Sequence, residues 1–432
     1  TYRRPMPLFA RAKEEVQPEP VVEPPEPSYL PGAPTTGEHG ARSVATHRDF
    51  LVGAVPSLRP FGIGLLEAAG LTLCESIVAD LDLPTCTSAT AAGWAVRASN
   101  LVGASPQLPV VLPVVDEIDA GGHRGAPLSP GTAVRVAVGA PVPDGADAVV
   151  PLTDGQVADD EVRFTAEVRF QQNLLLAGSR IADGDQLVES GAELTPRVLA
   201  LIAEVGHDKV LARPRPRVVV MTADTTLVEP GRPLTRLTES YDACTTLLAA
   251  TARDDGAQVF GAGIVPAEPH ALARALGEQL VRADLVLLVT ESTDELVAML
   301  GREGSVDVAE VDALPGRQVF ALVGPEQAPV LVLPPGSVPA YLTYLLLGRP
   351  LVKRLAGAED AAPVDVAESV AGPVDRDPER TRLVLARRTD LGLTPLAAHE
   401  PGTADLAAAD AVLVVPPGRE PLTGDVTCWP LG

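Results

Sequence analysis

The residue types that most often ligate metals or act as nucleophiles are scattered along this chain. None of the six histidines is spaced from another as in H-E-x-x-H, and the four cysteines form no C-x-x-C pair. No G-x-S-x-G, Walker A or G-x-G-x-x-G element occurs either. The sequence therefore predicts no structural zinc site and no disulfide framework, and buried free thiols are the expected state of the cysteines. These cysteines are Cys74, Cys86, Cys244 and Cys428.

One connection after a predicted strand has the position of a phosphate-binding loop but not its composition. Residues 285–289 (LVLLV) read as a buried strand, and residues 290–295 (TESTDE) follow it directly. This connection holds three carboxylates and no glycine. Without glycine the backbone cannot easily turn its N–H groups onto a phosphate, and the carboxylates would repel one. The sequence predicts no phosphate cradle here.

Charge and hydropathy exclude several classes of partner. The chain has 57 acidic and 34 basic residues, a net charge of −23. Such a surface repels nucleic acid and anionic membranes. No run of about 18 apolar residues is present, and the N-terminal residues lack the apolar segment of a secretory signal. We therefore expect a cytoplasmic protein with no nucleic-acid partner and no membrane insertion.

The texture of the sequence changes several times along the chain. Residues 1–42 are rich in proline and glutamate, which predicts a disordered tail. Apolar residues recur at helical spacing over 43–82, and short β-prone runs cut by glycine and proline follow over 83–171. Strands and helices then alternate over 213–357, which is typical of a parallel sheet covered by helices. Residues 358–432 are again rich in β-prone runs. The sequence predicts an α/β multi-domain protein.

A twelve-residue string, GAPVPDGADAVV at 139–150, closely resembles one family, the molybdopterin molybdotransferases (MoeA and the E domain of gephyrin). Further strings of this family follow in its order: GWAV at 93–96, LVEPG at 227–231, YD at 241–242 and GAGIV at 261–265. The resemblance implies an elongated four-domain chain. Its parts are a discontinuous helical domain (43–82 plus 172–212), an inserted β domain (83–171), an α/β molybdopterin-binding-like domain (213–357) and a C-terminal β domain (358–432). It also implies a homodimer.

The resemblance implies site residues as well, and several of them have changed. In the family string D-x-P-x-x-D-x-S-x-M-D-G-Y, Asp82 matches the first aspartate, whereas Thr87 and Ala92 stand where the family has carboxylates. A neutral alanine cannot ligate a cation or act as a base. Asp224 lies one residue away from the aspartate of T-G-D-E-L, because Thr225 holds that position.

Three other family positions keep the residue or its charge. Asp242 matches the aspartate of D-S-N, and Gly316 and Arg317 remain from K-P-G-K-P. We interpret Asp82 and Asp242 as vestigial catalytic candidates, and Asp224, Gly316 and Arg317 as vestigial cofactor-binding candidates, with no metal site. In the alternative interpretation these carboxylates cap turns and helices, and Arg317 is a surface cation.

Apolar and turn positions persist while polar site positions are lost, which favours a catalytically degenerate, gephyrin-like member of the family. The expected function is a non-catalytic, dimeric scaffold that binds a peptide segment of a cytoplasmic or membrane-associated protein, for example in cell division or the cytoskeleton, with no cofactor. Residues 412–418, with Tyr341 and Tyr344, are the candidate surface; a core strand and core helix residues are the alternative. The alternative function is a molybdopterin molybdotransferase that inserts molybdate into adenylylated molybdopterin with Mg²⁺.

Overall fold

The computed structural model describes residues 27–36, 40–358, 362–396 and 400–431, so the predictions for residues 1–26 lie outside it. The chain divides into two compact units. The first unit contains the described residues up to Pro56, residues 216–354 and those from 362 onward. The second unit contains residues 57–215 with a short segment that begins at Leu355. The multi-domain α/β prediction is confirmed.

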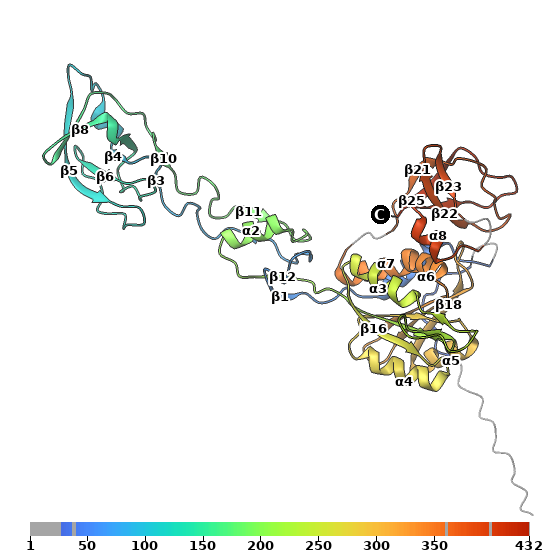
Figure 1. Ribbon diagram of the computed structural model, residues 1–432. Helices are drawn as coiled ribbons and strands as arrows, with labels where there is room; N and C mark the ends of the chain where they lie inside the picture. Colours follow the sequence, from blue (N-terminus) through green and yellow to red (C-terminus); the bar gives the residue numbers. More distant parts are fainter. Residues whose placement is uncertain (1–26, 37–39, 359–361, 397–399, 432) are drawn as a thin grey trace, which may run out of the picture. The chain divides into compact units, whose positions relative to one another are not determined.

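A six-stranded sheet forms the centre of the first unit (Figure 1), in the order β16-β13-β17-β20-β19-β18. Four strands are parallel, and β18 and β19 run antiparallel at one edge. The five residues of β17 are all buried, as expected for a parallel strand covered on both faces. The strands are β13 (Arg217–Ala223), β16 (Gln258–Val265), β17 (Leu285–Val289), β18 (Gly304–Glu310), β19 (Arg317–Val323) and β20 (Ala328–Leu333).

Helices cover both faces of this sheet (Figure 1). α4 and α5 lie on one face, where Leu276 and Leu300 pack against Val219, and α3, α6 and α7 lie on the other. Sequence signals set the helix starts, since Pro269 and the Glu268 side chain cap α4 and Thr293 caps α5. The helices of the unit are α1 (Val44–Ala54), α3 (Cys244–Asp254), α4 (Pro269–Leu280), α5 (Asp294–Glu303), α6 (Ser337–Thr343), α7 (Arg349–Ala356) and α8 (Thr403–Ala408). A π-helical segment, Tyr344–Gly348, joins α6 to α7.

The C-terminal residues form a five-stranded sheet in the order β21-β25-β24-β22-β23. Its β24 lies at the centre, and Val412, Leu413 and Val415 are fully buried there. Tyr344 is also buried, with its hydroxyl donated to Asp255. The proposed partner surface was therefore wrong for these residues, because they fill cores. The strands are β21 (Val366–Ser369), β22 (Arg382–Thr389), β23 (Gly392–Pro395), β24 (Ala411–Val415) and β25 (Asp425–Pro430).

Part of the N-terminal region that was expected to be disordered is bound to the edge strand β18. The Leu30 amide donates to the Val306 carbonyl at 2.9 Å, and the Val306 amide donates to the Ser28 carbonyl at 2.8 Å. Leu30 is buried. An edge strand offers unpaired backbone groups, which is why a segment with little helical or strand propensity is ordered here. The prediction of disorder was wrong for this stretch.

Helix α1 also belongs to this unit, although residues 43–82 were expected to pack with residues 172–212. The Ser43 hydroxyl caps α1, and Leu51 is fully buried. A buried ion pair between Arg42 and Asp307 of β18 fixes the start of this segment. The ion pair of Arg42 with β18 and the contact of α1 with residues 344–348 have no local sequence signal, and they decide where this helix packs.

A second six-stranded sheet, in the order β7-β4-β6-β5-β9-β8, lies in the second unit. Gly93 opens β4 where the neighbouring strand β7 comes very close, since a Cβ at this position would lie 2.1 Å from the Val150 carbonyl oxygen. The strands are β4 (Gly93–Val96), β5 (Val110–Ile118), β6 (Ala133–Val136), β7 (Ala148–Pro151), β8 (Gly155–Ala158) and β9 (Glu161–Phe164). Two 3₁₀ turns, Ala98–Leu101 and Leu152–Asp154, accompany them.

The rest of the second unit is built from short strand pairs. β1 (Phe61–Gly64) pairs with β12 (Lys209–Ala212), β2 (Ile77–Val78) with β11 (Gln186–Val188), and β3 (Ser88–Ala89) with β10 (Leu174–Leu175). Helix α2 (Pro196–Glu204) packs its Ile202 into the same core as Leu73. Residues 65–69, which favour helix by composition, form turns instead. Among the described residues no helix is long and apolar enough to cross a bilayer.

Candidate functional site

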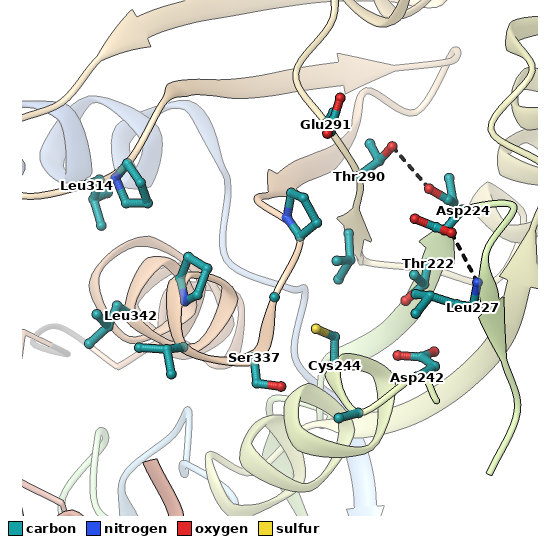
Figure 2. Close-up of a pocket in the computed structure, with 18 of the residues that line it drawn as sticks. Thr222, Asp224, Leu227, Asp242, Cys244, Thr290, Glu291, Leu314, Ser337 and Leu342 are labelled. Carbon is teal, nitrogen blue, oxygen red and sulfur yellow. Dashed lines mark hydrogen bonds between the residues drawn. The ribbon is translucent and has the colours of Figure 1, made fainter. Parts of the chain in front are cut away.

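A cavity of about 1250 Å³ opens at the carboxyl ends of β13, β17 and β20 in the first unit. Ligands of open α/β sheets bind at this end of the strands. Figure 2 shows Asp224 and Asp242 on one side of the cavity and Ser337 and Leu342 of α6 on the other, with Cys244 between them. Residues of the C-terminal domain complete the lining: Asp377, Arg380, Thr381, Arg382, Leu383, Glu400, Pro401, Gly402 and Thr403.

Asp224 follows β13 and holds the turn that leads into β14 (Leu227–Val228). Its Oδ1 accepts hydrogen bonds from the Thr226 hydroxyl at 2.7 Å and from the Leu227 amide at 3.1 Å. Partial burial acts to raise the pKa of Asp224, but the hydrogen bonds from Thr226, Leu227 and Thr225 outweigh it and lower the pKa below its usual value. Asp224 is thus an ionised carboxylate on the cavity wall.

Asp242 is a buried carboxylate at the start of α3, directly after β15 (Ser240–Tyr241). It accepts from the Thr245 amide at 3.0 Å and from the Thr245 hydroxyl at 2.5 Å. The Thr245 hydroxyl also meets that of Thr222 at 2.9 Å. Asp242 therefore satisfies the first turn of α3 while it lines the cavity, so the capping interpretation and the site interpretation both apply.

Cys244 lies beside Asp242 and is almost fully buried. Burial, reinforced by the charge of Asp242, raises the pKa of the Cys244 thiol. A thiol with a raised pKa stays protonated at neutral pH. It is a poor nucleophile, because the thiolate is the reactive form. The expectation of a buried free thiol is confirmed for this cysteine.

The connection after β17 presents hydroxyl and carboxylate groups to the cavity. Thr290, Glu291 and Thr293 line it, and the Thr290 hydroxyl donates to the Ala223 carbonyl at 3.3 Å. Arg317 reaches this connection from β19, where it donates to Asp294 at 2.8 Å and to the Ser292 carbonyl at 2.7 Å. The Arg317 guanidinium is thereby engaged by the chain's own acceptors.

Sequence reasoning placed five residues at the site, and the structure brings two of them to the cavity. Asp224 and Asp242 line it, whereas Gly316 and Arg317 follow the lining residues 313–315. Asp82 lies in the second unit, where its Oδ1 accepts from the Asp183 amide at 3.0 Å. This bond fits the turn-stabilising interpretation of Asp82.

The two arginines on the C-terminal wall were missed. Arg380 pairs with Glu310, and Arg382 donates to the Asp375 carbonyl at 2.8 Å. Arg380 precedes β22 and Arg382 is its first residue. Nothing in the composition of this strand points to a site, so only the fold brings the two arginines to the cavity. The single sequence signal was two arginines close together in an acidic chain. They are the cations among the described residues that line the cavity, against the carboxylates Asp224, Asp242, Glu291, Asp377 and Glu400, so an anionic ligand would depend on them.

A Mg²⁺ ion prefers several oxygen ligands in a near-octahedral array, and the carboxylates of the cavity are the groups that could supply them. Within the described ranges, no three His, Cys, Asp or Glu side chains gather closely enough to hold a metal ion. Asp224 and Asp242 each offer carboxylate oxygens that already accept hydrogen bonds. These residues do not fit a resident Mg²⁺ site formed by the protein alone.

Known proteins resemble this chain over most of its length. The profile of the MoeA N-terminal region (domain I and II) matches residues 42–206. Molybdopterin molybdenumtransferase 2 of Mycobacterium tuberculosis is 32% identical over 333 residues, which cover 74% of this chain and 81% of the relative. Molybdopterin molybdenumtransferase 1 of the same organism is 30% identical, with 89% and 97% covered.

Solved structures show the same fold. The MoeA molybdopterin biosynthesis protein from Pyrococcus horikosii superposes with a TM-score of 0.78 at 22% identity, covering 90% of this chain and 99% of its own. At this identity the likeness concerns the fold alone. Together with the sequence relatives, it confirms the resemblance seen in residues 139–150.

Proposed function

Because the chain belongs to the MoeA family, we propose that it acts as a molybdopterin molybdotransferase in molybdenum cofactor biosynthesis. The substrates would be adenylylated molybdopterin and molybdate. The observation that carries this proposal is the cavity at the carboxyl ends of β13, β17 and β20, with Asp224 and Asp242 on its wall. The names of the two Mycobacterium tuberculosis relatives support the same activity.

The chain's own residues would bind and orient this substrate. Arg382 and Arg380 would attract its phosphate groups. The Ser337 hydroxyl would donate a hydrogen bond to a polar atom of the pterin, and the Thr290 hydroxyl, whose proton is donated to the Ala223 carbonyl, would accept one. Asp224, ionised at neutral pH, would accept hydrogen bonds from pterin N–H groups. Since the residues do not form a resident Mg²⁺ site, the ion would enter with the substrate phosphates.

A second candidate is the non-catalytic scaffold, and one observation favours it. The loop 290–295 holds three carboxylates and no glycine, and Ala92 and Thr87 stand at positions where the family has carboxylates. A fold that keeps its packing while it loses polar site residues can serve as a binding platform. The partner would be a peptide segment of a cytoplasmic or membrane-associated protein. This candidate stays a prediction.

One assay separates the two candidates. Purified protein is incubated with adenylylated molybdopterin, molybdate and Mg²⁺, and release of AMP and of metallated cofactor is measured. The molybdotransferase proposal expects multiple turnovers and a strong loss of rate in Arg382→Ala. The exposed Arg274→Ala, whose partner is Glu278 on α4, is the control that leaves the rate unchanged. If the protein shows no turnover with metal-free substrate and none with Mg²⁺-loaded substrate, the molybdotransferase proposal is rejected and the scaffold candidate remains.

A further inference from the structure

The C-terminal wall of the cavity is fastened to the α/β sheet by two acidic residues at the end of β18. The Asp312 carboxylate accepts from the Thr381 amide at 3.0 Å and from the Thr381 hydroxyl at 2.7 Å, one bond on each oxygen. The Glu310 carboxylate forms an ion pair with Arg380, the residue that precedes Thr381. Two consecutive residues of the wall are thus held by the sheet that carries the opposite side of the cavity.

The turn that carries Asp312 is itself braced by the N-terminal segment. The Arg42 amide donates to the Glu310 carbonyl at 2.8 Å, and the Asp312 amide donates to the Arg42 carbonyl at 2.9 Å. The Arg42 side chain is anchored in turn by the buried Asp307 carboxylate. Backbone hydrogen bonds on both sides therefore fix the direction in which the Asp312 carboxylate projects.

The two fastenings differ in strength. Arg380 and Glu310 are half exposed, at 49% and 51%, and exposed ion pairs of this kind shift an equilibrium by less than about fivefold. The bonds from Thr381 to Asp312 are partly buried and have a carboxylate as acceptor, where a single bond is worth roughly a tenfold to a hundredfold shift. The contact between Thr381 and Asp312 is therefore the stronger of the two.

We propose that Asp312 is a positioning residue of the cavity. By holding Thr381 it keeps the neighbouring Arg382 and Leu383, which line the cavity, at the distance from Asp224 and Ser337 that a ligand must span. The identity of that ligand rests on the proposed function, whereas the fastening itself does not. The Asp312 side chain reaches the C-terminal wall through Thr381.

The first test needs no ligand. Hydrogen–deuterium exchange is followed in the full-length protein for wild type, Asp312→Ala, Asp312→Asn and the control Asp410→Ala. Asp410 accepts from the Arg388 amide at 2.7 Å in the same C-terminal domain, outside the cavity. We expect peptides over 376–383 to exchange about tenfold faster in Asp312→Ala, less so in Asp312→Asn, and at the wild-type rate in Asp410→Ala. Unchanged exchange over 376–383 in both Asp312 variants would overturn the proposal.

The second test measures the dissociation constant of adenylylated molybdopterin for the same variants and for Thr381→Val and Thr381→Ser. Thr381→Val keeps the amide and loses the hydroxyl, whereas Thr381→Ser keeps both. Binding should weaken about tenfold in Asp312→Ala and severalfold in Thr381→Val, with Thr381→Ser and Asp410→Ala near wild type. Equal affinity of all variants would overturn the proposal. Wild-type protein that binds no adenylylated molybdopterin would instead defeat the proposed function, and exchange alone would then decide on Asp312.

Discussion

Arg42 donates two hydrogen bonds to the carboxylate of Asp307, at 2.6 and 3.0 Å, although 265 positions separate the two residues. Both side chains are more than nine-tenths buried. The guanidinium also lies 5.8 Å from the centre of the Phe50 ring. This pair joins the N-terminal segment to the edge strand of the α/β sheet.

Replacing Arg42 should destabilise the first unit strongly. Arg42→Ala leaves the Asp307 carboxylate buried without its cation, which costs about 3–5 kcal/mol in comparable pairs. The free energy of unfolding in urea measures this loss. Arg48→Ala is the matched control, because the Asp49 partner of Arg48 is 70% exposed and little should change. A loss below 1 kcal/mol in Arg42→Ala would contradict the expected burial cost.

Stability should fall between pH 6.5 and pH 4 because of His47. Burial lowers the pKa of His47 to about 4; the charge of Asp307 opposes this lowering, and the charge of Arg42 adds to it by a smaller amount. The folded pKa lies below the unfolded value of 6.5, so the unfolded chain takes up the proton first. The contribution is complete above pH 6.5 and is lost as the pH falls through 4, by up to about 3 kcal/mol. The urea midpoints at pH 7 and pH 4.5 should lie further apart in wild type than in His47→Gln. An equal separation in the two proteins would contradict this role of His47.

Asp242 should separate helix capping from ligand binding. Asp242→Asn keeps an oxygen for the Thr245 amide, so stability should change by less than about 0.5 kcal/mol, whereas Asp242→Ala should cost about 1–2 kcal/mol. Both variants remove the carboxylate from the cavity wall and should weaken adenylylated molybdopterin binding alike. Thermal unfolding and titration with the ligand measure the two effects. Full affinity in Asp242→Asn would assign this residue to capping alone.

Gly93 should tolerate no side chain. In Gly93→Ala the new Cβ would collide with the Val150 carbonyl oxygen, so β4 and β7 must separate, at a cost of about 3 kcal/mol or more. Gly62→Ala is the control, because nothing lies within 4 Å of its Cβ position. Circular dichroism on heating compares the two. A Gly93→Ala protein as stable as Gly62→Ala would show that the strands adjust easily.

Local sequence patterns predicted the elements in which apolar residues form a continuous run or recur at a fixed spacing. The apolar run at 285–289 became β17, and the alternation of strands and helices expected over 213–357 is present from β13 to α7. The antiparallel pairing of β18 with β19 was not anticipated, since the residues of β18 match no single period and the apolar run in β19 does not indicate its direction. Residues 412–415 could be interpreted as core or surface because an apolar strand alone does not say what covers it.

The candidate site was harder to predict than the fold. Asp224 follows β13, at the carboxyl end of the parallel strands where ligands of such sheets bind, so its place followed from the fold class. Asp242 follows β15, which pairs only with β14 in a separate two-stranded sheet among the described residues, so its place did not. Arg380 and Arg382 come from another domain, and Arg317 is bound by Asp294, a contact that depends on the first turn of α5. Such tertiary pairings leave no periodic signal in the sequence.

The pairing of β1 with β12 has a consequence for synthesis on the ribosome. Phe61 lies opposite Ala212, so the second unit is closed as soon as residue 212 has left the exit tunnel. The N-terminal segment, by contrast, must wait for Asp307 before Arg42 finds its partner. During that interval α1 also lacks residues 344–348, which it contacts in the folded protein. The nascent chain should therefore protect its middle from proteases before it protects its beginning, and a stalled chain ending near residue 290 should be cut first around α1.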